Sequence, residues 1–275
     1  MTLGELLRSM RGKAVLVVGD LMLDEYIVGS ATRISPEAPV MVVRQREVRR
    51  MPGGAANVAR NVAALGGRAS LVGLVGDDDG GRELRACLEG AGLGALHLCT
   101  DGSRPTTRKT RVLADHAHQV LRIDAEDDRP IGASVEEALA RAVEEASRHA
   151  DAVLVSDYRK GAVTRAVCEA ALAAARSRGL PAVANPKPRS LDQYAGFTLV
   201  SLNRVEAAEA LGRTSALTDD EAPNAARALA ERVGAAVVVT LGESGMVACW
   251  GGSTMAFPAP KVEVYDTAGA GDTVI

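Results

Sequence analysis

The fold is first indicated by residues 14–20, Ala-Val-Leu-Val-Val-Gly-Asp. The apolar run Ala14–Val18 is continuous, which is typical of a strand buried on both faces of a parallel sheet. Similar runs follow at Leu71–Val75, Ala152–Val155, Pro181–Ala184, Thr198–Ser201 and Ala235–Thr240. Helical patterns separate these runs, and strands that alternate with helices build βαβ units around one sheet. The sequence therefore predicts a doubly wound, mostly parallel α/β fold.

Amphipathic segments between the strands predict the helices. Gly54–Leu65 has helical periodicity and is followed by Gly66-Gly67, and glycine commonly ends a helix. Ser134 and Glu137 have the spacing of a capping box, in which two side chains bond backbone N–H groups at a helix start. They predict a helix over Ser134–His149. Further helices are expected at Gly80–Glu89, Thr164–Arg178 and Asn203–Leu211.

Two stretches differ from this pattern, because polar and apolar residues alternate in Val40–Arg50 and in Thr106–Asp124. Alternation is typical of a sheet with one packed face and one solvated face. We interpret them as a small β-lid, over about residues 26–50 and 104–124 of a single domain that spans residues 1–275. A pair of surface hairpins without function is the alternative. Apolar residues at alternating lid positions favour a homodimer formed through the lid, namely Val40, Val42, Val112 and Val120.

The composition limits the classes of function. The 275 residues are 47% hydrophobic and 24% charged, as expected of a globular protein with a full core. The formal net charge of -3 argues against non-specific binding of nucleic acid. No apolar run is long enough to span a membrane and the N-terminus lacks a signal-peptide pattern, so no membrane partner is expected. The cysteines lack CxxC spacing, which favours reduced thiols in a cytoplasmic protein.

The most informative motif is Asp266-Thr267-Ala268-Gly269-Ala270-Gly271-Asp272-Thr273. Its small residues allow the backbone N–H groups of 269–272 to approach an anion, and a helix that begins there would add its positive end. Such a nest suits the charge that develops on a transferred phosphoryl group. Asp272 is placed to accept the proton of an attacking hydroxyl. A tight turn that only caps a helix is the alternative interpretation.

A second glycine-rich segment is Pro52-Gly53-Gly54-Ala55-Ala56-Asn57-Val58-Ala59. Its glycines admit a ligand close to the backbone, and Asn57 is one helical turn further on, where it could bond sugar hydroxyls. The segment lacks the Gly-Lys-Ser/Thr ending of a P-loop and does not follow a strand as a dinucleotide-binding motif does. An ordinary glycine-rich helix start is the alternative.

Two further motifs follow predicted strands. Asn203 and Glu206 are three residues apart on one helix face, so their oxygens could hold magnesium directly or through water. A helix N-cap with a capping box between the same two residues is an equally good interpretation. Thr240-Leu241-Gly242-Glu243-Ser244-Gly245 is a glycine loop at a strand end that could pass close to nucleotide phosphates, or could be a plain turn.

In their order along the chain, these four motifs resemble the PfkB carbohydrate kinases. The resemblance covers essentially the whole chain and implies a ribokinase-like fold with a β-lid over the sugar. It implies Asp272 as the catalytic base, and Gly269, Ala270 and Gly271 as the anion hole. It also implies ATP and Mg2+ as cofactors, with Asn203 and Glu206 reaching the metal through water or phosphate. The implied nucleotide contacts are Asn203, Glu206, Thr240, Gly242 and Gly245.

Finer resemblance narrows the substrate. Residues 19–26, 33–40, 121–124 and 156–161 resemble the heptose 7-phosphate kinases, including Gly19-Asp20-Leu21-Met22-Leu23-Asp24-Glu25-Tyr26. This implies phosphorylation of the anomeric hydroxyl of D-glycero-D-manno-heptose 7-phosphate to the 1,7-bisphosphate, on the route to ADP-heptose and the lipopolysaccharide core. In some of these proteins the kinase is fused to a nucleotidyltransferase. The alternatives are a kinase of another sugar phosphate or nucleoside, and a non-catalytic module that binds sugar phosphate.

A substrate that carries its own phosphate needs cations, which Arg grips bidentately and Lys contacts as a point charge. The candidates are Lys109, Arg111, Arg122, Lys160 and Lys187, although a solvated basic strand is the alternative for 108–111. By resemblance, the sugar hydroxyls should meet Asp20, Gly53, Gly54 and Asn57. Asp24, Arg33 and Asp157 lie in the same matching segments and complete the expected substrate-binding set.

The sequence departs from the family pattern in two places. Asn185-Pro186-Lys187 stands where the heptose kinases usually have Asp-Pro-Lys, so a hydrogen-bonding shape is kept and a charge is lost. The sequence ends at Ile275, whereas family members continue into helices that close the adenine pocket. We therefore expect a fold without those C-terminal helices, and we expect these residues alone to bind ATP weakly and to turn over slowly.

Overall fold

The computed structural model describes residues 2–115, 118–261 and 269–275. Within those residues, nine strands form one large sheet. Their order is β13 (Ser253–Phe257), β12 (Met246–Trp250), β11 (Ala236–Thr240), β10 (Leu199–Asn203), β9 (Ala182–Asn185), β8 (Ala152–Ser156), β1 (Ala14–Gly19), β4 (Arg68–Val75) and β5 (Leu96–Thr100). All neighbours pair in parallel except β12, which is antiparallel to β11 and to β13. This arrangement confirms the predicted mostly parallel sheet.

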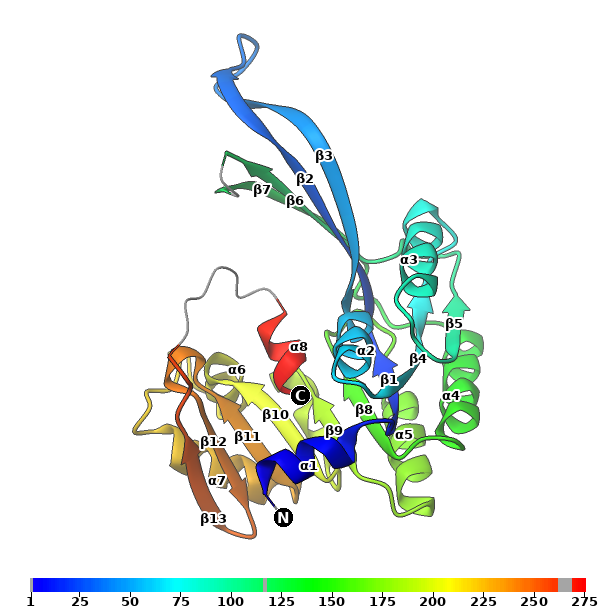
Figure 1. Ribbon diagram of the computed structural model, residues 1–275, viewed down its shortest axis with the longest axis vertical. Coiled ribbons are helices and arrows are strands. Elements are labelled where there is room, and N and C mark those ends of the chain that lie inside the picture. Colours follow the sequence, from blue (N-terminus) through cyan, green and yellow to red (C-terminus); the bar gives the residue numbers. More distant parts are fainter. Residues whose placement is uncertain (1, 116–117, 262–268) are drawn as a thin grey trace.

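Helices cover both faces of the large sheet (Figure 1). They are α1 (Leu3–Met10), α2 (Ala55–Ala64), α3 (Asp79–Glu89), α4 (Ala133–Ser147), α5 (Arg165–Ser177), α6 (Arg204–Ala210), α7 (Ala222–Val233) and α8 (Ala270–Val274), with short 3-10 turns η1 (Pro188–Tyr194) and η2 (Gly242–Ser244). Within the described residues, no helix has the length and apolar character needed to cross a membrane.

The start of α4 corrects one prediction. Its N-cap is Gly132, and no side chain caps it. Ser134 therefore lies inside the first turn, so the predicted capping box between Ser134 and Glu137 is wrong. The helix begins one residue earlier than predicted, after Gly132, whose φ of -67° and ψ of 152° are ordinary for an N-cap residue.

Strand β1 is buried on both faces, as its continuous apolar sequence predicts. Leu16 and Val18 belong to a core formed with α4, α5, α6 and α7. Val17 points the other way, into a second core formed with α2 and α3. Complete burial of one such aliphatic side chain contributes about 1.5–3 kcal/mol relative to its exposure. The two cores hold β1 in place, and with it the position of every residue that follows its carboxyl end.

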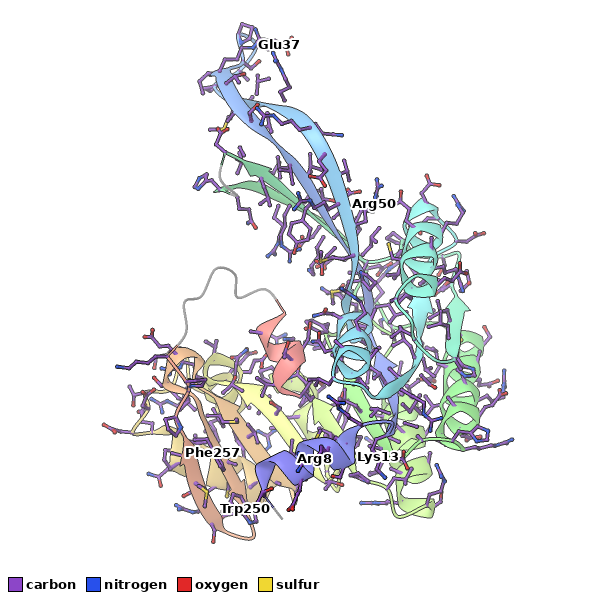
Figure 2. All side chains as sticks on the ribbon, viewed as in Figure 1. Arg8, Lys13, Glu37, Arg50, Trp250 and Phe257 are labelled. Atoms are coloured by element: carbon purple, nitrogen blue, oxygen red, sulfur yellow. The ribbon has the colours of Figure 1, made fainter. Side chains whose placement is uncertain are left out.

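A second sheet of four strands projects from the large one (Figure 1). In this small sheet the order is β3 (Met41–Gly54), β2 (Leu21–Ile34), β6 (Arg108–Ala114) and β7 (His118–Ala125). Strand β2 is antiparallel to β3 and parallel to β6. Its first residues, Leu21 and Leu23, are buried in the core with α2, whereas Ile34 is exposed. Glu37 lies at the far tip and Arg50 near the base (Figure 2).

The two faces of the small sheet differ in chemistry. Asp24 pairs in register with Lys109, and Tyr26 pairs with Arg111, so these four side chains share one face. The opposite face carries apolar residues, of which Ile123 is half exposed. Both alternating stretches that we interpret as a lid, apart from residues 116–117 outside the described part, lie in or next to this sheet. The charged face therefore defines where polar ligands could meet the small sheet.

Candidate active site

Asp272 lies in the short helix α8, where segments from three parts of the chain meet. This residue is 7% exposed. Asn57 donates from Nδ2 to one carboxylate oxygen at 2.9 Å, and the Tyr158 hydroxyl donates to the other at 2.5 Å. Burial raises the pKa of Asp272 above its usual range, although these two donors partly oppose the effect. A buried carboxylate with a raised pKa and fixed orientation suits the role of general base.

The neighbours of Asp272 keep it in one orientation. Burial and the charge of Asp272 raise the pKa of Tyr158, so its hydroxyl stays protonated and remains a donor. Asn61, one turn beyond Asn57 on α2, donates to the Asp272 carbonyl oxygen at 3.2 Å. Gly269 has φ 76°, a left-handed conformation that favours glycine, and forms the N-cap of α8. Residues 270 and 271 begin the helix, while 266–268 lie outside the described residues.

Asp24 faces Asp272 from the small sheet, and its charge contributes to the raised pKa of Asp272. Arg111 donates from Nη1 to Asp24 at 2.6 Å, and its guanidinium also lies 5.3 Å from the Tyr26 ring. A Cβ on Gly53 would come within 2.1 Å of the Asp24 carboxylate. Glycine at that position therefore lets Asp24 lie directly against the backbone at the start of α2.

Most of the predicted phosphate-binding cations lie on the charged face of the small sheet or next to it. Lys109 contacts Asp124 and Glu126, each at 3.3 Å, and Lys160 contacts Glu126 at 2.8 Å. Arg122 contacts Asp124 at 3.0 Å. The structure thus brings Lys109, Arg111, Arg122 and Lys160 together with the carboxylates of Asp24, Asp124 and Glu126. With four cations and three carboxylates, this group has a net charge of +1.

Arg33 does not join this group. It is an exposed residue close to the distal end of β2. The nine residues that separate it from Asp24 along the strand correspond to roughly 30 Å. Within one copy of the chain, Arg33 is therefore remote from Asp272.

Asp20 and Asp157 follow neighbouring strands, and protein donors surround both carboxylates. Asp20 is 1% exposed and accepts hydrogen bonds from the backbone N–H groups of Tyr158, Lys160 and Ala162, at 2.7, 3.1 and 3.0 Å. Burial and the charge of Asp157 raise the pKa of Asp20 to about 6. The predicted contacts of both acids with sugar stay predictions, because the structure shows their oxygens bonded to the protein.

Asp157 is itself held from another element. The hydroxyls of Ser190 and Tyr194 in η1 donate to its Oδ2 at 2.6 and 3.0 Å, and the N–H of Arg159 donates to Oδ1 at 2.7 Å. Two buried acids therefore hold the segment that follows β8: Asp20 bonds its N–H groups, and Asp157 attaches it to η1.

Asn203 and Glu206 form the capping box that was one of the two interpretations of their spacing. Asn203 is the N-cap of α6, and its Oδ1 accepts from the N–H groups of Val205 and Glu206. Glu206 returns one oxygen to the Asn203 N–H at 3.0 Å and holds Lys187 with the other at 2.5 Å. Over the described residues, no group of three or more His, Cys, Asp or Glu could hold a metal ion.

The glycine loop after β11 has a structural reason for its glycines. Gly242 and Gly245 have φ 65° and 100°, and a Cβ on Gly245 would lie 2.0 Å from the carbonyl oxygen of Phe257. The loop turns β11 into β12, where Thr240 pairs with Met246. A nucleotide contact by Thr240, Gly242 and Gly245 stays a prediction.

Comparison with known proteins decides the family. Residues 13–275 match the family described as pfkB family carbohydrate kinase. The chain belongs to this family. It is 46% identical over 276 residues to the bifunctional protein HldE of Caulobacter sp. strain K31, covering 99% of this chain and 56% of that protein. It is 46% identical over 264 residues to HldE of Azorhizobium caulinodans, covering 95% and 54%. The chain thus spans about half the length of these curated relatives.

Solved structures with a similar fold include phosphofructokinase-2 from Escherichia coli. Its tetrameric inhibited form has a TM-score of 0.75 and 21% identity, covering 96% of this chain and 84% of that one. Its complex with fructose-6-phosphate has a TM-score of 0.72 and 22% identity, with the same coverage. At these identities the similarity shows the fold alone, and it confirms the predicted ribokinase-like architecture.

One site residue of this pfkB family member was missed from the sequence. Tyr158 follows β8 at the carboxyl edge of the sheet, and its ring lies 4.9 Å from Lys187 Nζ. Its position within Ser156-Asp157-Tyr158, directly after a buried strand, is a signal that could have found it. Lys187 therefore lies in the group around Asp272, because it contacts both Tyr158 and Glu206.

A groove of about 530 Å³ opens behind Asp272 on one face of the large sheet. Apolar residues of α2 and of three strands form much of its wall, including Val58, Val62, Val15, Val153, Leu154 and Val183. The groove extends to Lys13 and Pro181, near the amino ends of the strands. Ligands of such folds bind at the carboxyl ends, and a sugar phosphate needs polar partners. This apolar groove does not fit the predicted substrate.

Proposed function

We propose that this chain transfers the γ-phosphoryl group of ATP to the anomeric hydroxyl of D-glycero-D-manno-heptose 7-phosphate, in a Mg2+-dependent reaction. The observation that carries the proposal is the buried Asp272 carboxylate, held by Asn57 and Tyr158 and facing Asp24 of the small sheet. Membership of the pfkB family and the relatives named HldE support a sugar-phosphate kinase. The choice of heptose rests on the matching segments around Asp20, Arg33, Arg122 and Asp157.

Asp272 acts as the general base in this proposal. The sugar hydroxyl gives its proton to the carboxylate, and its oxygen forms a bond to the γ-phosphorus. The bond from that phosphorus to the bridging oxygen breaks, and ADP leaves. Asn57 and Tyr158 keep the carboxylate from rotating away, so the acceptor oxygen is in place before the hydroxyl arrives.

The charged face of the small sheet supports recognition of a phosphorylated sugar. Arg111 and Lys109 lie on the same face as Asp24, and Lys160 joins them through Glu126. A phosphate that carries almost two negative charges can replace carboxylates as their partner, because charge-assisted bonds to Arg and Lys are the strong ones. In this proposal Asp24 accepts hydrogen bonds from the sugar hydroxyls, and the cations bind the phosphate.

The oxygens of Asn203 and Glu206 are already engaged, so these residues fit an indirect contact with magnesium better than direct coordination. Magnesium usually keeps several waters and binds through one or two carboxylates together with nucleotide phosphates. Bound in that way, it would neutralise charge on the phosphates. Glu206 of α6 would accept hydrogen bonds from water on the metal, and Lys187, which follows β9, would contact the phosphates.

A homodimer through the small sheet is a second part of the proposal. Apolar side chains are exposed along that sheet, namely Ile34, Val40, Met41, Leu121 and Ile123. Exposed apolar side chains mark an interaction surface where they form a contiguous patch, and in this proposal these residues pack against a second copy of the chain. A similar fold occurs in a tetrameric form of phosphofructokinase-2, which supports assembly of this fold in general.

ADP release, measured against a panel of free and phosphorylated sugars that includes the heptose 7-phosphate, tests the proposal. We expect turnover on the heptose phosphate that falls about 100- to 10,000-fold in Asp272→Asn, as loss of a general base typically costs 10²–10⁴-fold. Arg165→Gln, which removes only an exposed ion pair on α5, is the matched control. Turnover on another sugar phosphate alone would reject heptose as the substrate. Unchanged turnover in Asp272→Asn would reject the assigned base.

A further inference from the structure

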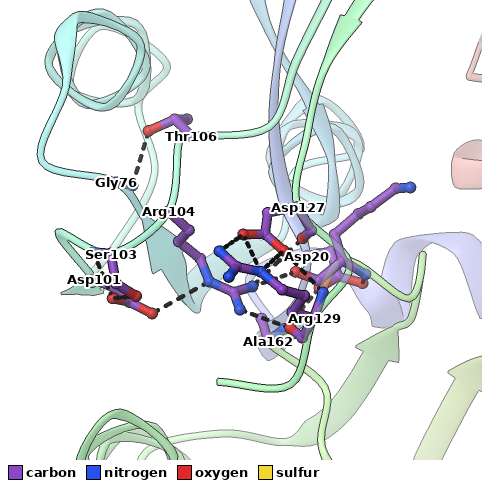
Figure 3. Close-up of polar contacts among 10 residues, drawn as sticks. Asp20, Gly76, Asp101, Ser103, Arg104, Thr106, Asp127, Arg129 and Ala162 are labelled. Atoms are coloured by element: carbon purple, nitrogen blue, oxygen red, sulfur yellow. Dashed lines mark hydrogen bonds and ion pairs between the residues drawn. The ribbon is translucent and has the colours of Figure 1, made fainter. Parts of the chain in front are cut away.

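A buried polar network lies where the small sheet joins the large one (Figure 3). At its centre is Arg104, which is 8% exposed. Its Nε contacts Asp101 Oδ2 at 3.2 Å. Its other nitrogens donate to backbone carbonyls, at 2.6 Å to Arg129 and 3.1 Å to Lys160. A buried guanidinium whose terminal nitrogens bond carbonyl oxygens of several segments holds the backbone of those segments at fixed distances.

These segments are two of the connections between the small sheet and the rest of the chain, and the loop that follows β8. Residues 101–107 lead from β5 into β6, and residues 126–132 lead from β7 into α4. Arg104 belongs to the first connection and bonds to the second through Arg129 and, at 3.5 Å, through the carbonyl of Asp127. Its bond to Lys160 ties both connections to the loop after β8.

Asp20 holds the same loop from the opposite side. It accepts from the N–H of Lys160 while Arg104 donates to the carbonyl of Lys160. The main chain of Lys160 is therefore held by one buried carboxylate and one buried guanidinium. A cavity of only about 10 Å³ is lined by Asp20, Arg104 and their neighbours, so there is room for about one water between them.

Gly161 shows how closely the loop and Arg104 approach. Its φ is 95°, and a Cβ there would lie 2.5 Å from Nη1 of Arg104. A second fixed point lies nearby, since Thr106 accepts from the N–H of Gly76 and donates from its hydroxyl to Asp78. The start of β6 is thus attached to the start of α3 as well as, through Arg104, to the loop after β8.

The loop carries two groups of the candidate active site. Tyr158 donates to the Asp272 carboxylate at 2.5 Å, and Lys160 contacts Glu126, which also contacts Lys109 of the small sheet. A displacement of the loop by an ångström would therefore move the donor of the base and a phosphate-binding cation together. Misplacement on that scale, from a residue distant from the chemistry, can cost as much as 100-fold in rate.

We propose that Arg104 and Asp20 are positioning residues that clamp Lys160 from both sides, so that the small sheet and the loop bearing Tyr158 and Lys160 move as one unit. This inference rests on the proposed function, and it assigns Asp20 to the protein backbone. Neither residue contacts the reacting atoms; they act through Tyr158 and Lys160. The clamp makes the geometry around Asp272 depend on the position of the small sheet.

The test compares Arg104→Lys and Asp20→Asn with wild type, and uses Arg165→Gln as the control for loss of one cation at the surface. Arg104→Lys keeps the charge but cannot reach all its partners, and Asp20→Asn keeps the shape but loses one of two acceptor oxygens. Steady-state kcat and KM are normalised to the folded fraction from thermal unfolding. Hydrogen exchange of the 158–162 backbone is measured on the same samples without substrate.

We expect faster exchange in 158–162 in both variants, and a kcat that is about 10- to 100-fold lower per folded molecule. Unchanged kcat per folded molecule would reduce the clamp to a contribution to stability and overturn the inference. Unchanged exchange in 158–162 would overturn it as well, even if one variant folds too poorly for kinetics. If wild type phosphorylates none of the sugars, the proposed function fails, and the exchange result alone decides whether the clamp exists.

Discussion

The hydroxyl of Tyr158 can be removed with little other change, and the consequence for Asp272 follows from the structure. Tyr158→Phe deletes one of the two side-chain donors to the carboxylate, at 2.5 Å, and keeps the ring that lies 4.9 Å from Lys187. A hydrogen bond to a charged group contributes about 1.5–3 kcal/mol. That energy favours ionised Asp272, so its loss disfavours ionisation by about 10- to 100-fold.

The sign of the pH effect is fixed by the role of the base. Burial already raises the pKa of Asp272, and the lost donor is one of the groups that opposes this rise. Because the base acts only when ionised, the acid limb of kcat/KM should move to higher pH in Tyr158→Phe. On the acid side the rate should fall about 10- to 100-fold, and at high pH it should approach the wild-type value more closely.

The assay is kcat/KM for the sugar phosphate between pH 5 and pH 9, for wild type, Tyr158→Phe and the Arg165→Gln control. An acid limb that stays in place, or that moves to lower pH, would refute the reasoning that Tyr158 stabilises the ionised base. An equal loss of rate at every pH would show that the hydroxyl only holds Asp272 in place.

Other changes test other parts of the site. Burial raises the pKa of Asp20 from 3.8 to about 6 in the folded protein, so protonation of Asp20 stabilises the fold at low pH. The free energy of unfolding in urea should therefore differ between wild type and Asp20→Asn in a pH-dependent way. The advantage of wild type should fall by up to about 3 kcal/mol between pH 4 and pH 6.5 and stay constant at higher pH. Arg111→Met should raise KM for the phosphorylated sugar about 10- to 100-fold, with a smaller change in kcat, in the same ADP-release assay. Gly245→Ala should destabilise the fold by roughly 2–3 kcal/mol, seen as a lower Tm, because its Cβ would lie 2.0 Å from a backbone oxygen at φ 100°. Ile123→Lys should convert a dimer to a monomer in sedimentation velocity, and a wild-type monomer would contradict assembly through the small sheet.

The sequence predicts the large sheet well because a strand that is buried on both faces has an uninterrupted run of apolar residues. Ala14–Val18 is apolar at every position, and β1 is indeed enclosed by two cores. Strands β12 and β13 were not predicted, because each has only five residues; β12 alternates in burial over that short length, and β13 is mostly exposed. A short edge hairpin of this kind is hard to distinguish from an irregular loop without its partner strand.

The candidate site could be predicted by position but not by partner. Placing Asp20 directly after β1 is correct, yet no local pattern shows that its carboxylate bonds to N–H groups about 140 residues later. The Asn203 and Glu206 pair allowed two interpretations, and only the observed bonds show that a capping box is formed. The importance of Tyr158 depends on a contact with Asp272, 114 residues away. Such contacts arise from tertiary packing and have no counterpart in local periodicity.

The continuous path of β2 from the core into the small sheet limits how the length of this protein can vary in evolution. Inserting one residue between Leu21 and Asp24 would turn Asp24 and Tyr26 to the opposite face, because side chains alternate along a strand. Insertions near Glu37, at the tip between β2 and β3, would leave that alternation intact. Homologues should therefore differ in length at the tip of the small sheet and keep a constant length at its base.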